Sequence, residues 1–160
     1  MLLVFEIIGF CVLFTLLVRL SAVGGAVNAL YFYPEKYQRK AISIGLSDRQ
    51  TIKKKKMRFM LPFCIILLTV LVILIGAVNR NGYFKNAYLQ SLLFLEIMNI
   101  YDGIIIDKVW VGYGRLWKIK GMEGVPYIQS WGGMFIKRGI LAILWLILAA
   151  IPAGIVTMLF

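Results

Sequence analysis

The chain has 160 residues, is 61% hydrophobic and carries a net charge of +11, whereas soluble domains are about 45–50% apolar. Its apolar residues form long blocks and charged residues make up only 16%, so the composition excludes a soluble domain and indicates one integral membrane domain over residues 1–160. Histidine, the commonest proton relay and metal ligand, is absent, and the two cysteines lie in apolar stretches, where they are interpreted as packing residues rather than as a disulfide.

Four apolar blocks predict an all-α fold, a four-helix transmembrane bundle. A spanning helix needs about 20 mainly apolar residues, and the predicted spans are residues 2–33, 59–78, 87–106 and 139–160. The first block is longer than one span requires, so it is expected to tilt or to bend near Gly24 and Gly25. Pro62 is placed in the first turn of the second span, where proline is tolerated.

The loops differ sharply in positive charge. Loops 34–58 and 107–138 together carry fifteen lysines and arginines, whereas the loop between them carries only Arg80 and Lys85. Because cytoplasmic loops of membrane proteins are enriched in lysine and arginine, the two basic loops are predicted to face the cytoplasm and both termini to lie outside.

The first basic loop is predicted to be structured and partly interfacial. Residues 47–50 match the capping-box pattern, which predicts a helix that starts there and runs into the second span. Residues 34–44 mix charged and apolar side chains, as in segments that lie along a membrane surface.

A basic run in this loop abuts the second span and consists of Lys53, Lys54, Lys55, Lys56 and Arg58. One interpretation is binding of anionic lipid headgroups, each basic residue contributing about 1 kcal/mol near the surface. The other is a plain topology determinant. No nucleic-acid-binding module accompanies the run, so nucleic acid is not an expected partner.

The third span carries the candidate site. The polar residues Glu96, Asn99 and Asp107 fall on one helical face together with Gly103, and Asp102 lies on its flank. A charge at the bilayer centre costs about 2.5–3.5 kcal/mol even on lenient scales. This face is therefore expected to point toward the interior of the bundle and to form a ligand-binding surface or ion pathway. Arg19 of the first span is expected to pair with Asp102 or Glu96. A purely structural ion pair between the two helices is the alternative.

The second basic loop, residues 107–138, is rich in glycine and aromatic residues. It is interpreted either as an interfacial aromatic belt or as a lid folded over the cytoplasmic mouth of the bundle. On the fourth span, small residues from Ala149 to Gly154 have the spacing that permits close helix contact or dimerisation.

Asn99, Asp102, Asp107 and Trp110, together with residues 33–46, resemble a family of small four-span bacterial membrane proteins. Related sequences often read Asn-x-x-Asp-x-x-x-x-Asp at the end of their third span. The resemblance implies a bacterial cytoplasmic-membrane location and no particular activity. The CDP-alcohol phosphotransferases also place aspartates at a membrane boundary, but the Ala-Arg pair and additional spaced aspartates of that family are missing here.

Three functions stay open on the sequence. The first is binding or transport of a small polar solute, a cation or a lipid through the polar face of the third span. The second is a metal-dependent enzyme acting on a lipid or lipid-linked phosphate, with Mg²⁺ held by Asp102 and Asp107, since Mg²⁺ takes oxygen ligands. The third is a non-catalytic subunit of a homo-oligomer or larger membrane complex. No resident cofactor and no catalytic residue are predicted, because no nucleophile constellation is recognisable.

Overall fold

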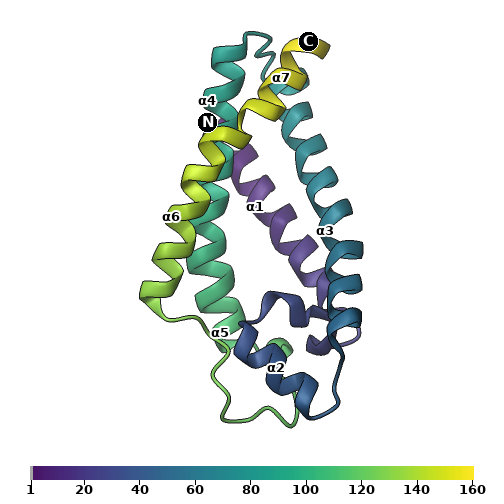
Figure 1. Ribbon diagram of the computed structural model, residues 1–160. Coiled ribbons are helices and arrows are strands. Elements are labelled where there is room, and N and C mark those ends of the chain that lie inside the picture. The colour runs from purple at the N-terminus through teal and green to yellow at the C-terminus, as the bar shows by residue number, and fades with distance from the viewer. Residues whose placement is uncertain (1) are drawn as a thin grey trace.

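The computed structural model describes residues 2–160 and is helical, with no strand among those residues. Four helical segments are long and apolar enough to cross a membrane: Leu2–Ser21, Arg49–Val78, Phe84–Tyr113 and Trp131–Leu159. They pack as a bundle, and both ends of the chain lie toward the end away from the basic loops (Figure 1). The predicted all-α, four-span membrane fold is confirmed.

The first span, helix α1 (Leu2–Ser21), is shorter than the predicted 2–33. The chain turns at Gly24 and Gly25, whose φ angles of +81° and +114° are ones that side-chain-bearing residues rarely adopt. A 3₁₀ segment, η1 (Ala26–Phe32), follows and packs on the neighbouring helix α3. The bend near these glycines is confirmed, but the continuation of the span to residue 33 is wrong because the α-helix ends at Ser21 and the chain turns at the two glycines.

The first basic loop contains helix α2 (Glu35–Ser43), whose Tyr37 and Ala41 are buried. Helix α3 (Arg49–Val72) then runs directly through the basic run into the second span, which a π-helical segment, η2 (Ile73–Val78), completes. The predicted helix start is confirmed, but its cap is Asp48 rather than Ser47: the Asp48 carboxylate accepts a hydrogen bond from the Thr51 amide at 2.9 Å. Pro62 consequently lies inside α3 and not in its first turn.

The third span comprises α4 (Phe84–Tyr101), the π-helical segment η3 (Asp102–Trp110) and the short α5 (Val111–Tyr113). It extends the predicted 87–106 at both ends. A 3₁₀ turn, η4 (Arg115–Trp117), opens the second basic loop.

The fourth span comprises α6 (Trp131–Leu148) and α7 (Ala150–Leu159). It begins eight residues before the predicted 139, because the Ser130 hydroxyl caps the helix by accepting from the Gly133 amide at 3.1 Å. Ala149 and Ala153 are fully buried, and α7 packs closely on α4. These small residues therefore serve helix contact within the chain.

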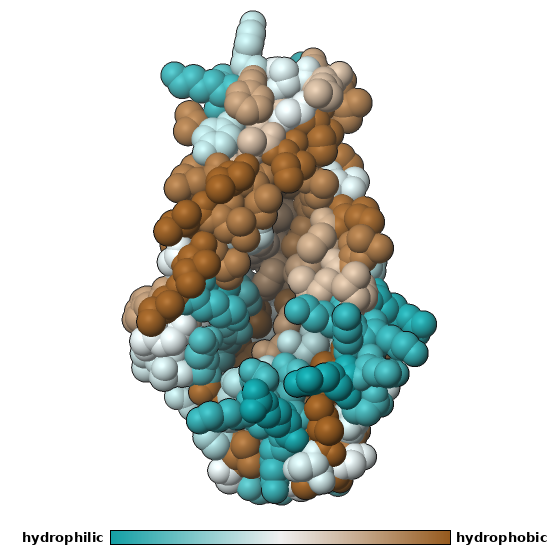
Figure 2. Space-filling model, viewed as in Figure 1, coloured by the Kyte–Doolittle hydropathy of each residue, from teal (hydrophilic) through white to brown (hydrophobic). Residues whose placement is uncertain are grey.

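The outer surface has the pattern of a membrane-embedded bundle. Large apolar side chains such as Phe5, Leu61 and Ile147 are more than 60% exposed. On the face seen in Figure 2, apolar side chains form a brown band over the upper and middle parts of the molecule, whereas hydrophilic side chains gather at the lower end, with the basic loops. An apolar belt of this kind fits a multi-pass protein surrounded by lipid.

Candidate ligand cavity and its polar end

A cavity of about 720 Å³ lies among the four spans. Figure 2 shows it as a hollow that opens on the side of the bundle, between α6 and α3 in the view of Figure 1. Its walls are mainly apolar: among the lining side chains are Phe10, Phe14, Val18, Phe63, Leu67, Leu71, Leu141, Trp145 and Leu148. The opening lies at the lower edge of the apolar belt, where apolar side chains border it above and hydrophilic side chains border it below (Figure 2).

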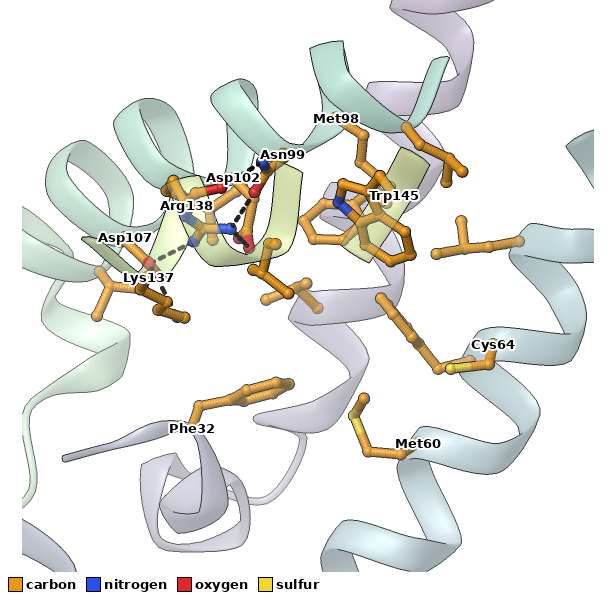
Figure 3. A pocket seen from close by; sticks show the side chains of 18 of the residues that line it. Phe32, Met60, Cys64, Met98, Asn99, Asp102, Asp107, Lys137, Arg138 and Trp145 are labelled. Atoms are coloured by element: carbon orange, nitrogen blue, oxygen red, sulfur yellow. Dashed lines mark hydrogen bonds and ion pairs between the residues drawn. The ribbon is translucent and has the colours of Figure 1, made fainter. Parts of the chain in front are cut away.

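One end of the cavity is polar and is organised by Arg138 of α6. The Arg138 Nη1 donates to Asp102 Oδ2 at 2.6 Å, and Nη2 donates to Asp107 Oδ2 at 2.5 Å. The Asn99 side-chain amide donates to the Arg138 carbonyl at 3.1 Å, which ties α4 to the α6 backbone. The Arg138 cluster is the name used below for five residues: Asn99, Asp102, Asp107, Lys137 and Arg138 (Figure 3).

The π-helical segment η3 is the local reason that one guanidinium reaches both carboxylates. In a regular α-helix, residues five apart differ by about 140° in direction, since each residue advances about 100°. In a π-helix the repeating hydrogen bond joins residues five apart, so Asp102 and Asp107 come to one side of the helix. The π-helical turn of η3 therefore lets both carboxylates contact the guanidinium of Arg138.

Gly103 makes room for the Arg138 side chain. A Cβ added at Gly103 would lie 2.9 Å from the Arg138 Nε and 3.2 Å from its Cγ, closer than packed atoms tolerate. The arginine therefore lies flat against the helix backbone at this glycine, and its side chain is only 10% exposed.

The structure brings together three of the five residues predicted for the site, Asn99, Asp102 and Asp107. Glu96 is half-buried, does not line the cavity, and has no hydrogen bond or ion pair with any residue from 2 to 160. The expected pairing of Arg19 is wrong: Asp102 pairs with Arg138, and Arg19 is exposed. Because α1 ends at Ser21, Arg19 lies in its last turn, where its long side chain can extend toward the membrane boundary.

Arg138 was the residue that sequence reasoning missed. The fourth span was predicted to begin at residue 139, which left Lys137 and Arg138 in a loop. The available signal was Ser130 followed by an apolar stretch containing Met134, Phe135 and Ile136, which is the pattern of a capped helix that starts earlier.

Lys137 also lines the cavity and makes weaker ion-pair contacts than Arg138. Its side chain is 47% exposed, and its Nζ lies 3.4 Å from Asp107 Oδ2. Nearby, Lys108 donates to the Gln129 carbonyl, and its ammonium lies 4.6 Å from the centre of the Trp131 ring. Among the residues that line the cavity, Lys137 and Arg138 therefore face two carboxylates, Asp102 and Asp107.

The second basic loop closes the polar end of the cavity. Trp117 is 1% exposed and lines the cavity with Tyr127. The Tyr33 hydroxyl donates to the Trp117 carbonyl at 2.6 Å, and the Tyr127 hydroxyl donates to the Val111 carbonyl at 3.2 Å. Burial, followed by the neighbouring tyrosines, raises the pKa of the Tyr33 phenol well above its usual value. The predicted cover over the mouth of the bundle is thus present at Trp117 and Tyr127.

Other aromatic residues of this loop remain on the surface. Tyr113 and Trp131 are 84% and 58% exposed, as an interfacial belt predicts. The two interpretations of the loop therefore apply to different residues within it.

The basic run lies apart from the cavity. Lys53, Lys54, Lys56 and Arg58 are exposed on the first turns of α3, and none of the run lines the cavity. Lys55 donates to the Asn28 side-chain carbonyl at 2.7 Å, which joins α3 to η1. Binding of anionic lipid by this run stays a prediction, since it concerns the outer surface.

Fold and cavity together define a class: a multi-pass helical membrane protein with an amphipathic cavity that opens on its side. Comparisons of the chain with protein-family models, curated proteins and solved structures give no significant match. The resemblance to small bacterial membrane proteins stays a prediction, and function has to be argued from the cavity itself.

Proposed function

We propose that the protein binds a membrane lipid, with a hydrocarbon chain in the cavity and a polar headgroup at the Arg138 cluster. The observation that carries the proposal is the division of the cavity into apolar walls and one polar, charged end. A ligand with the same division, a long apolar chain ending in a polar group, matches both parts.

The position of the opening supports a lipid over a water-soluble ligand. The hollow lies at the lower edge of the apolar belt, with hydrophilic side chains beside its lower part (Figure 2), so a lipid can enter it from the bilayer with its headgroup toward the polar end. A volume of about 720 Å³ lies within the roughly 300–1,000 Å³ of small-molecule sites. Apolar walls without contacting atoms lose dispersion energy, so a hydrocarbon chain in this space stabilises the bundle.

The alternatives from the sequence fit the cavity less well. A cation or polar solute crossing the bundle has to pass walls such as Phe10, Phe14 and Phe63, where an unpaired charge is costly. A magnesium ion between Asp102 and Asp107 has to displace the Arg138 guanidinium, which already contacts both carboxylates. A role as a subunit of a complex is compatible with lipid binding and is not argued from the cavity.

The proposed setting is the bacterial cytoplasmic membrane, with the basic loops on the cytoplasmic side. This orientation is supported by the charge difference between the loops. It places the Arg138 cluster toward the headgroups of the cytoplasmic leaflet and the apolar walls toward the bilayer centre.

The test is native mass spectrometry of the protein released from lipid nanodiscs, comparing Cys64→Trp with Ile65→Trp. Cys64 lines the cavity from α3, so the indole fills part of the space for a chain. Ile65 is the next residue, is 54% exposed and does not line the cavity, so it provides a matched control.

Wild type and Ile65→Trp are expected to retain a bound lipid at collision energies that strip bulk lipid, and Cys64→Trp to lose it. Circular dichroism establishes that both variants keep their helix content. Equal lipid retention by the two variants, or no retained lipid in wild type, refutes binding in the cavity.

A further inference from the structure

We infer that the lipid carries an anionic phosphate headgroup and that Lys137 is the residue that binds it. This inference rests on the proposed lipid-binding function and adds the chemical class of the headgroup and the residue that selects it. From the sequence, binding of anionic lipid was expected at the basic run Lys53 to Arg58, and Lys137 was predicted to lie in a loop.

Arg138 is the more obvious anion-binding residue, but both of its terminal nitrogens already contact carboxylates, and its Nε, which is buried without a hydrogen-bond partner, lies against Gly103. Nη1 and Nη2 contact Asp102 and Asp107 at 2.6 Å and 2.5 Å, and Nη1 lies 3.4 Å from the Asn99 side-chain carbonyl. With its side chain 10% exposed and Gly103 against its Nε, Arg138 positions the two carboxylates and joins α6 to the third span. An added anion would compete with the two carboxylates for the terminal nitrogens of Arg138.

Lys137 has the free capacity that Arg138 lacks. Its Nζ lies 3.4 Å from Asp107, longer than the roughly 2.7–2.9 Å of a full charge-assisted hydrogen bond. An ammonium group has three donors, and this side chain is about half exposed while also lining the cavity. Figure 3 shows Lys137 beside Arg138 and Asp107 at the polar end of the cavity. A phosphate oxygen can therefore bind Lys137 while all contacts of Arg138 remain.

The donors that remain free favour an anion over a cation. Arg138 contacts both carboxylates of the cluster, Asp102 and Asp107, whereas the Lys137 ammonium keeps donor capacity. An anionic headgroup can accept hydrogen bonds from that ammonium, whereas a cation would have to compete with Arg138 for the carboxylates. The overall charge of +11 acts in the same direction.

The test compares phosphatidylglycerol with phosphatidylcholine of identical acyl chains, mixed in equal amounts in nanodiscs with full-length protein. Native mass spectrometry reports the ratio of the two lipids retained. Wild type is expected to prefer phosphatidylglycerol by about fivefold, the effect of one basic residue near a membrane surface. Lys137→Gln is expected to reduce the ratio toward one, and Lys137→Arg to restore it.

Lys40→Gln serves as the matched control, because Lys40 is an exposed residue of α2 that does not line the cavity. It is expected to leave the ratio unchanged. A ratio in Lys137→Gln as high as in wild type places the headgroup elsewhere and overturns the inference.

The remaining outcomes separate this inference from the function on which it rests. If wild type retains both lipids equally and Cys64→Trp loses both, lipid binding stands and anionic selection is overturned. If wild type retains neither lipid, the proposed function itself fails. Displacement of phosphatidylglycerol by inorganic phosphate at equal concentration assigns the site to a free anion and likewise overturns the lipid headgroup.

Discussion

The substitution Arg138→Met tests whether one arginine holds the third and fourth spans together. Methionine keeps much of the side chain's length and apolar stem but removes the guanidinium, so Asp102 and Asp107 lose the partner that both contact. Both carboxylates then remain at the end of an apolar cavity, five residues apart on one side of η3. The variant is expected to lose a substantial part of its free energy of unfolding.

The magnitude follows from the burial of the three side chains. Removing one partner of a buried ion pair costs about 3–5 kcal/mol. Arg138 is 10% exposed, but Asp102 and Asp107 are 23% and 29% exposed, so partial hydration favours the lower end, about 3 kcal/mol. At about 2–4 °C per kcal/mol for a chain of this size, the midpoint of thermal unfolding should fall by roughly 6–12 °C.

The assay is thermal unfolding followed by circular dichroism in one detergent for all variants. Arg138→Met combined with Asp102→Asn and Asp107→Asn is the control, because neutral amides do not need a counter-charge, and most of the lost stability should return. A midpoint within 2 °C of wild type for Arg138→Met, or a triple variant less stable than the single one, refutes an ion-paired lock.

Three further substitutions test separate parts of the structure. Gly103→Ala should cost about 1–3 kcal/mol of unfolding free energy, because its Cβ would lie 2.9 Å from the Arg138 Nε. Gly112→Ala is the control and should be nearly neutral, since its nearest contact would be 3.4 Å away. Equal unfolding midpoints for the two variants would contradict the tight fit at Gly103. Tyr33→Phe removes the hydroxyl that donates to the Trp117 carbonyl and should cost about 0.5–1.5 kcal/mol of unfolding free energy. Tryptophan fluorescence should change as the second basic loop loosens. An unchanged spectrum and unfolding midpoint would show that this hydrogen bond does not hold the loop. Hydrogen bonds from Thr51 lower the pKa of the Asp48 carboxyl. The stabilisation from this carboxylate is therefore present above the ordinary aspartate pKa and is lost as pH falls through the lowered pKa of the folded protein. Asp48→Asn should flatten that part of the curve of unfolding free energy against pH, and an identical curve in the variant would contradict the capping role.

The sequence predicted the class of the protein because hydrophobicity and charge act locally. Four apolar blocks separated by basic loops are sufficient to define four spans, since the bilayer requires each about 20 residues to be apolar and helical. The same reasoning found the aspartates of the site, because carboxylates within a span are costly and must be compensated. The break at Gly24 and Gly25 and the helix start near Ser47 were likewise readable from short-range patterns.

The partner of those aspartates was decided only by the tertiary structure. Arg19 was the only partner expected from the sequence, because Arg138 was placed in a loop, and the choice between the two depends on where α1 ends, where α6 begins and how η3 turns its carboxylates. None of these has a local sequence signal as strong as hydrophobicity, because a shift of a few residues in a helix end or one π-helical segment changes which side chains meet. The cavity has the same origin: the sequence determined that its walls are apolar, but the volume enclosed depends on how four helices pack, which no single segment encodes.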